Sequence, residues 1–196
     1  DVLATYLALT KTLTGERIGF VMFDAYAVTA FPLTTDHDYV AAQLALARKQ
    51  ISAGPIAGAA APRVGSSLIG VQQFDQEEQK RSRTIVFGTD NLVSGDSIYT
   101  VAEAAKQATD SAVMVFAVMP AGSEPAQVED LTKAVEPTGG DTLLVQPGKE
   151  TNPALISEAI KAQQKSAILA TAQDRSFDLI WPGALLFLAG LAAGSV

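Results

Sequence analysis

Strand-length apolar runs alternate with segments of helical periodicity along most of this 196-residue chain, and this alternation limits the possible folds more than any other feature. The clearest runs are residues 18–23 (IGFVMF), 83–88 (RTIVFG) and 112–119 (AVMVFAVM). Strands that are apolar on both faces belong to sheets that are covered on both sides. The segment with Val128, Leu131 and Val135 at helical spacing is typical of such a cover. The sequence therefore predicts an α/β fold with a doubly wound, mostly parallel sheet and helices on both faces.

Local signals place the remaining elements. The expected elements are a helix over 2–13 ended by Gly15, a second strand over 27–31, a helix capped by Thr35 and Asp36, a loop over 54–62, a helix with Leu68, Val71 and Phe74, a helix over 101–108, a strand over 142–145 and a helix over 155–160. Pro32 should close the second strand, which favours an edge position for it.

Composition excludes several classes of function. The net charge is −7, and no Lys/Arg run is longer than a pair, so nucleic acid is not an expected partner. The chain has no cysteine, which excludes disulfides, thiolate metal sites and cysteine nucleophiles. Its one histidine, His37, excludes a zinc site made of several histidines.

The C-terminal residues 179–196 contain no charge and are rich in Leu, Ala and Gly. As a helix they would extend over about 27 Å, the thickness of a bilayer core. We therefore expect an α/β domain over 1–170, a juxtamembrane linker over 171–178 and a transmembrane helix over 179–196, with Trp181 at the interface. A buried C-terminal helix of a soluble domain is the alternative.

Oxygen-bearing side chains lie in the loops expected at the carboxyl edge of the sheet. They are Asp24, Ser66, Ser67, Asp90 and Asn91. In parallel sheets, ligands bind beyond the carboxyl ends of the strands. A set of carboxylates and hydroxyls suits a hard divalent cation such as Mg²⁺. The simpler alternatives are that Asp90 caps the next helix and that Asp24 caps a turn.

The order of these segments resembles a von Willebrand factor A (vWA) domain over roughly residues 1–165. The resemblance lies in GERIGFVMFDAYAVTAFPLTTDHDYV, VGSSLIG, RTIVFGTDNLVSG, AVMVFAVMPAG and TGGDTLLV, in that order. That family holds a divalent metal with an Asp-x-Ser-x-Ser motif after its first strand, a threonine and an aspartate. The resemblance assigns Asp90 to the aspartate and Ser67 to the threonine. The Asp-x-Ser-x-Ser motif is absent, and the family's first strand is expected to precede Asp1.

Together with the apolar C-terminus, the sequence looks most like bacterial membrane-anchored vWA proteins of the Bat type. This resemblance implies binding and not catalysis, at the bacterial cell membrane, with an extracytoplasmic domain. Mg²⁺, or Mn²⁺ or Ca²⁺, would be held with incomplete coordination, and an acidic side chain of a partner protein would complete the shell. Other membrane subunits are possible partners.

Three alternatives to this interpretation remain. A nucleotide- or small-ligand-binding Rossmann-like enzyme has a related topology, but the chain lacks G-x-G-x-x-G and G-x-x-x-x-G-K-S/T motifs. A hydrolase would need a G-x-S-x-G elbow, which is also absent. A metal-independent membrane scaffold is the third.

Overall fold

The computed structural model describes residues 2–23, 27–52, 82–91, 99–146 and 153–165. The chain divides into two units, Asp1–Ala159 and Ile160–Val196. Residues 154–165 are helical, as expected for 155–160; residues 154–159 belong to the first unit and 160–165 to the second. The described elements of the first unit are α1 (Val2–Thr12), β1 (Ile18–Phe23), β2 (Ala27–Thr34), α2 (His37–Ser52), β3 (Arg83–Gly88), α4 (Val101–Asp110), β4 (Val113–Pro120), α5 (Pro125–Val135), the 3-10 helix η2 (Glu136–Thr138) and β5 (Thr142–Val145).

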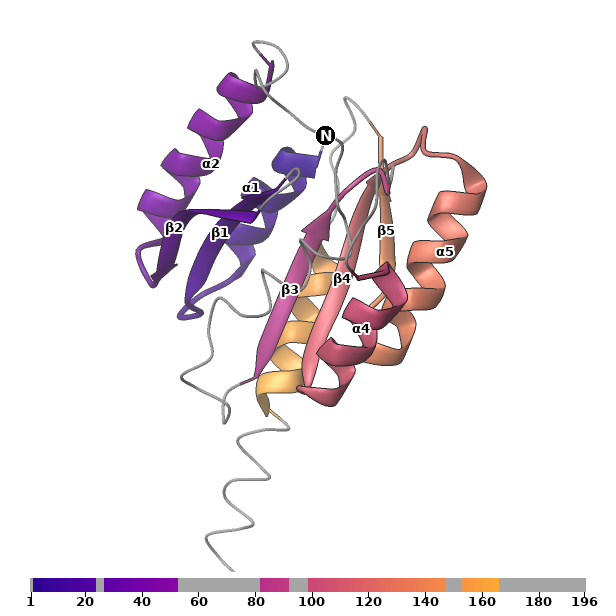
Figure 1. Cartoon of the computed structure of the whole chain (residues 1–196). Coiled ribbons are helices and arrows are strands. Elements are labelled where there is room, and N and C mark those ends of the chain that lie inside the picture. Colours follow the sequence, from indigo (N-terminus) through magenta and orange to yellow (C-terminus); the bar gives the residue numbers. More distant parts are fainter. Residues whose placement is uncertain (1, 24–26, 53–81, 92–98, 147–152, 166–196) are drawn as a thin grey trace, which may run out of the picture. The chain divides into compact units, whose positions relative to one another are not determined.

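Strands β3, β4 and β5 form a three-stranded parallel sheet in the order β3-β4-β5 (Figure 1). Residues Arg83 to Gly88 pair with Val113 to Val118, and Ala117 to Pro120 pair with Thr142 to Val145. β4 is the middle strand, and from Val115 to Met119 all its side chains are buried. The near-continuous apolar sequence of β4 thus reflects cover on both faces, as predicted.

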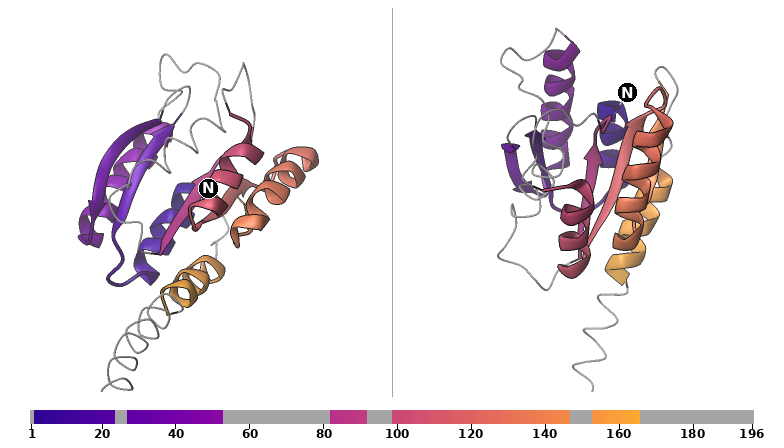
Figure 2. Two further views of the ribbon diagram at one scale, coloured as in Figure 1. Left: turned by 60° about the horizontal axis from the view of Figure 1, so that its bottom comes forward. Right: turned by 45° about the vertical axis from the view of Figure 1, so that its right-hand side comes forward.

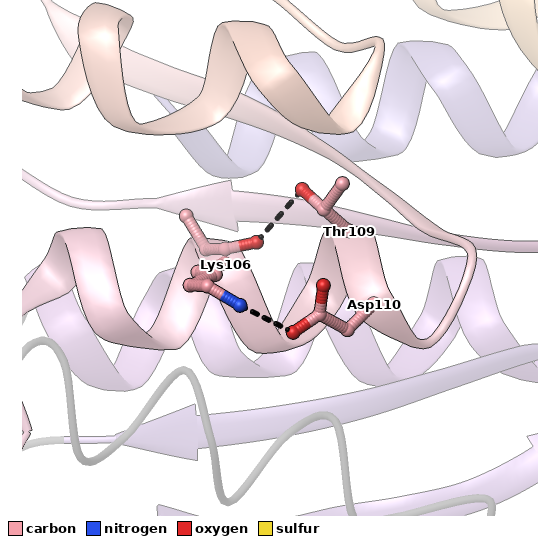
Figure 3. A network of polar contacts seen from close by, with 4 residues as sticks. Lys106, Thr109 and Asp110 are labelled. Carbon is pink, nitrogen blue, oxygen red and sulfur yellow. Dashed lines mark hydrogen bonds and ion pairs between the residues drawn. The ribbon is translucent and has the colours of Figure 1, made fainter.

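Helices α4 and α5 cover one face of this sheet. Alternate β4 residues share one core cluster with side chains from both helices: Val113, Val115, Ala117 and Met119 with Ala104, Ala108, Leu131 and Val135. The small alanines of α4 allow that helix to approach the strand closely. The outer side of α4 is polar: Lys106 forms an ion pair with Asp110 at 2.8 Å, and the Thr109 hydroxyl donates to the Ala105 carbonyl (Figure 3).

Helix α1 lies on the opposite face of the sheet, beside β3. Gly88 pairs with Val118, so both residues face away from the cluster that holds α4 and α5. A Cβ atom on Gly88 would collide with Val2 and with the Tyr6 hydroxyl. That hydroxyl donates to the Val86 carbonyl over 3.1 Å and is close to the Gly88 backbone N–H. Because Gly88 lacks a side chain, α1 can bring Tyr6 against the edge of β3.

The hairpin of β1 and β2 makes a second, antiparallel sheet (Figure 2). Phe31, Val40 and Leu44 form its buried core with α2, and residues of α1 pack against them. Phe20 lies 5.8 Å from Phe31, measured between ring centroids. Phe23, at the end of β1, stacks on Phe87 of β3 at 4.8 Å and joins the hairpin to the main core.

Three expectations need correction or remain open. The single sheet is found as two, because β1 and β2 pair with each other and, within the described residues, with no other strand. β2 does not end at Pro32 but continues to Thr34, which is possible because β2 pairs on one side only. The helix predicted around Leu68, Val71 and Phe74 lies outside the described residues.

No helix in the described part of the chain is both long and apolar enough to cross a membrane. The predicted transmembrane helix over 179–196 and the linker over 171–178 lie outside that part.

Candidate functional site

The carboxyl ends of β3, β4 and β5 meet at one edge of the sheet because the three strands are parallel. The residues that follow β3 are Thr89, Asp90 and Asn91, and those that follow β4 include Ser123. Asp90 is exposed at this edge, as expected from its place after a buried strand. It does not cap α4, because the N-cap of that helix is Thr100.

A short turn with two buried anchors holds Asp90. Thr89 and Asn91 are only 9% and 8% exposed. The Thr89 backbone N–H donates to the Val118 carbonyl at 3.1 Å, which extends the ladder to β4 by one residue. The Thr89 hydroxyl accepts from the Asn91 backbone N–H at 3.0 Å. The turn is therefore fixed on both sides of Asp90, and the Asp90 side chain lies at the surface.

Asn91 closes this turn in a backbone conformation that few residue types tolerate. Its φ is +56°, in the left-handed region, where asparagine is one of the least strained side chains. Its side-chain amide nitrogen donates to the Gln127 carbonyl of α5 at 3.0 Å. The turn is thus attached to two elements, β4 through Thr89 and α5 through Asn91.

The oxygen atoms at this edge fit a hard cation in their chemistry. Besides the Asp90 carboxylate, Asn91 Oδ1 and Ser123 Oγ are buried and have no hydrogen-bond partner. Unpaired buried oxygens cost free energy, and a bound ion or water relieves that cost. The described residues contain no group of three or more His, Asp or Glu side chains that could hold a metal by themselves.

Of the residues predicted for the site, the structure describes Asp90 and Asn91. Asp24, Ser66 and the second predicted metal ligand, Ser67, lie outside the described residues. His37, which we expected at a solvated helix start, begins α2, and its Nε2 lies 2.8 Å from the Glu16 carbonyl oxygen.

Sequence reasoning found the turn but missed its attachment to α5. The available signal was an asparagine directly after a Thr-Asp pair at a strand end, which favours a left-handed turn. The acceptor, the Gln127 carbonyl, is a backbone atom 36 residues away and leaves no trace in the sequence.

No protein-family model matches the sequence, and no curated protein matches it significantly. Several solved structures are similar, among them two from Bacteroides species. BatB from Bacteroides thetaiotaomicron is 18% identical, with a TM-score of 0.62 over 83% of this chain and 86% of that one. An aerotolerance-related membrane protein from Bacteroides fragilis is also 18% identical, with a TM-score of 0.60 over 84% of this chain and 87% of that one. The resemblance to Bat-type vWA proteins expected from the sequence is thus confirmed at the level of the fold: this chain has the α/β fold of the Bat-type proteins.

Proposed function

We propose that this protein is a membrane-associated vWA-like interaction module that binds a partner protein through a divalent metal at the carboxyl edge of its sheet. The observation that carries this proposal is the exposed Asp90 on a turn fixed from both sides, at the edge where parallel sheets bind their ligands. The fold shared with BatB and with the aerotolerance-related membrane protein supports an association with the membrane. On this proposal, residues 179–196 are the anchor and the domain is extracytoplasmic.

Asp90 and Ser67 are the proposed metal ligands. A carboxylate and a hydroxyl match the preference of Mg²⁺ and Mn²⁺ for hard oxygen donors. When bound, the metal would supply positive charge that lets a second carboxylate approach a protein whose net charge is −7. The expected ligand is therefore an acidic side chain of another protein, and the expected output is binding without turnover.

Calorimetric titration of the full-length protein in detergent with Mn²⁺ and Mg²⁺ tests this proposal. Asp90→Asn removes the charge without changing the size of the side chain and should abolish the binding heat. Asp130→Asn is the matched control, because Asp130 is an exposed aspartate on α5 and its change in net charge is the same.

Loss of binding in Asp90→Asn alone would support a metal site at this edge. Equal binding in both variants would place the metal elsewhere, and no binding by the unaltered protein would leave a metal-independent membrane scaffold. Circular dichroism spectra of the variants check that each retains its fold.

A further inference from the structure

We propose that Asn91 is a positioning residue for the Asp90 carboxylate, acting by tying the turn after β3 to helix α5. This inference rests on the proposed function, because it assigns Asn91 a role in the affinity of the Asp90 site for a divalent cation. Asn91 would act through Asp90. If its unpaired Oδ1 ligated the metal directly, loss of the side chain would lower the affinity but leave the mobility of Asp90 without metal unchanged.

The geometry separates two tasks of Asn91. Its backbone, at φ +56°, turns the chain after Asp90, and its N–H donates to the Thr89 hydroxyl at 3.0 Å. Its side chain makes a different bond, from the amide nitrogen to the Gln127 carbonyl at 3.0 Å. The first bond stays within the turn, whereas the second reaches another element. The side chain of Asn91 therefore carries the tether to α5.

The tether complements the anchor on the other side of Asp90. Thr89 is held to β4 by its backbone bond to Val118, so the turn is fixed at its first residue without help from Asn91. Without the amide of Asn91, the turn would lose its bond to α5, and Asp90 would be held firmly from one side only. A metal ligand has to be held to within about 0.5 Å of its productive position. Loss of a group that orients a ligand typically lowers metal affinity about 10- to 100-fold.

Both tasks together restrict the residue type at this position. Glycine adopts a positive φ easily but has no amide to donate to Gln127. Aspartate tolerates the left-handed region, but its carboxylate accepts hydrogen bonds and cannot donate one. Asparagine tolerates the positive φ and can donate to Gln127, and Asn91 is buried.

Asn91→Gly removes the tether, because glycine tolerates the positive φ and lacks the amide. Ala112→Gly is the matched control: Ala112 is an exposed residue at φ +53°, between α4 and β4, at the amino end of that strand. The dissociation constant for Mn²⁺ and the backbone ¹⁵N order parameter of Asp90, the latter without metal, are measured on both variants. We expect Asn91→Gly to raise the dissociation constant about tenfold or more and to lower the order parameter. Ala112→Gly should change neither quantity.

A dissociation constant for Asn91→Gly within twofold of the unaltered protein, which itself binds Mn²⁺, would overturn the positioning role and leave the proposed function standing. Failure of the unaltered protein to bind Mn²⁺ would overturn the proposed function, and the role of Asn91 in metal affinity with it. If Asn91→Gly does not fold, the Asp90 order parameter without metal is measured on Asn91→Asp instead, since aspartate cannot donate to the Gln127 carbonyl. An unchanged Asp90 order parameter in Asn91→Asp would also overturn the proposal.

Discussion

Replacing Tyr6 by phenylalanine should change the stability of the domain in opposite directions at neutral and at alkaline pH. The Tyr6 hydroxyl donates to the Val86 carbonyl at the edge of β3. At pH 8 the substitution removes this bond, and we expect the free energy of unfolding to fall by about 1 kcal/mol, the usual net value of such a hydrogen bond.

The alkaline effect follows from the pKa of the same group. Burial raises the pKa of Tyr6 above its ordinary value, an effect that the nearby Gly88 backbone N–H partly offsets. The folded state therefore favours the protonated hydroxyl, whereas the unfolded chain releases the proton from about pH 10. The contribution of this group to stability is fully present below that pH. Above it, stability falls by about 1.4 kcal/mol per pH unit until the folded pKa is reached.

The phenylalanine variant has no proton to lose at this position. Its stability deficit of about 1 kcal/mol at pH 8 should therefore shrink above pH 10 and reverse to a small gain at pH 11, where the ionisation costs the unaltered protein about 1.4 kcal/mol. Urea denaturation followed by far-ultraviolet circular dichroism at pH 8, 9, 10 and 11 measures this difference. Tyr39→Phe is the control, because Tyr39 is exposed. The stability difference between this variant and the unaltered protein should be the same at every pH. A constant difference between Tyr6→Phe and the unaltered protein from pH 8 to 11 would refute the reasoning.

Three further changes test the local structure by urea denaturation. Thr138→Val should lower the free energy of unfolding by about 1–3 kcal/mol, because the Thr138 hydroxyl accepts from the Val115 N–H at 2.9 Å and valine leaves this donor unpaired. Thr138→Ser keeps the hydroxyl and should retain most of the stability. Ala112→Gly should stabilise by about 0.5–1 kcal/mol, since relief of the left-handed strain exceeds the entropy cost of glycine. Asp36→Ala should lower the free energy of unfolding by about 1 kcal/mol, because the Tyr39 N–H loses its capping acceptor. Asp36→Asn keeps an acceptor oxygen and should retain the stability. Stability unchanged by the Val or Ala substitution, or lowered by the Gly substitution, would contradict the corresponding argument.

Much of the fold could be predicted because its signals are local. The apolar run before Pro120 predicts a buried strand, and β4 is the buried middle strand of its sheet. The pair Thr35 and Asp36 predicts a helix start, and Asp36 Oδ1 accepts from the Tyr39 N–H at the start of α2. Such features depend on residues a few positions apart in the chain, so they can be predicted from the sequence alone.

The candidate site could be predicted only in part. Asp90 is recognisable as a carboxylate at a strand end. Its second proposed ligand, Ser67, lies outside the described residues and stays a prediction. The tether from Asn91 to Gln127 could not be predicted, because a backbone carbonyl is the same in every residue type and only its position makes it a partner.

The sequence by itself determined which segments become strands and helices, since apolar periodicity and caps act over a few residues. The tertiary structure decided which strands pair, where α1 meets the edge of β3 and how the turn around Asp90 is held. These outcomes depend on contacts between residues far apart in the chain, such as Tyr6 with Val86, Phe23 with Phe87 and Asn91 with Gln127. The physical reason is that a side chain sets its own local preferences, whereas the partner of a buried polar group is fixed only when the elements have packed.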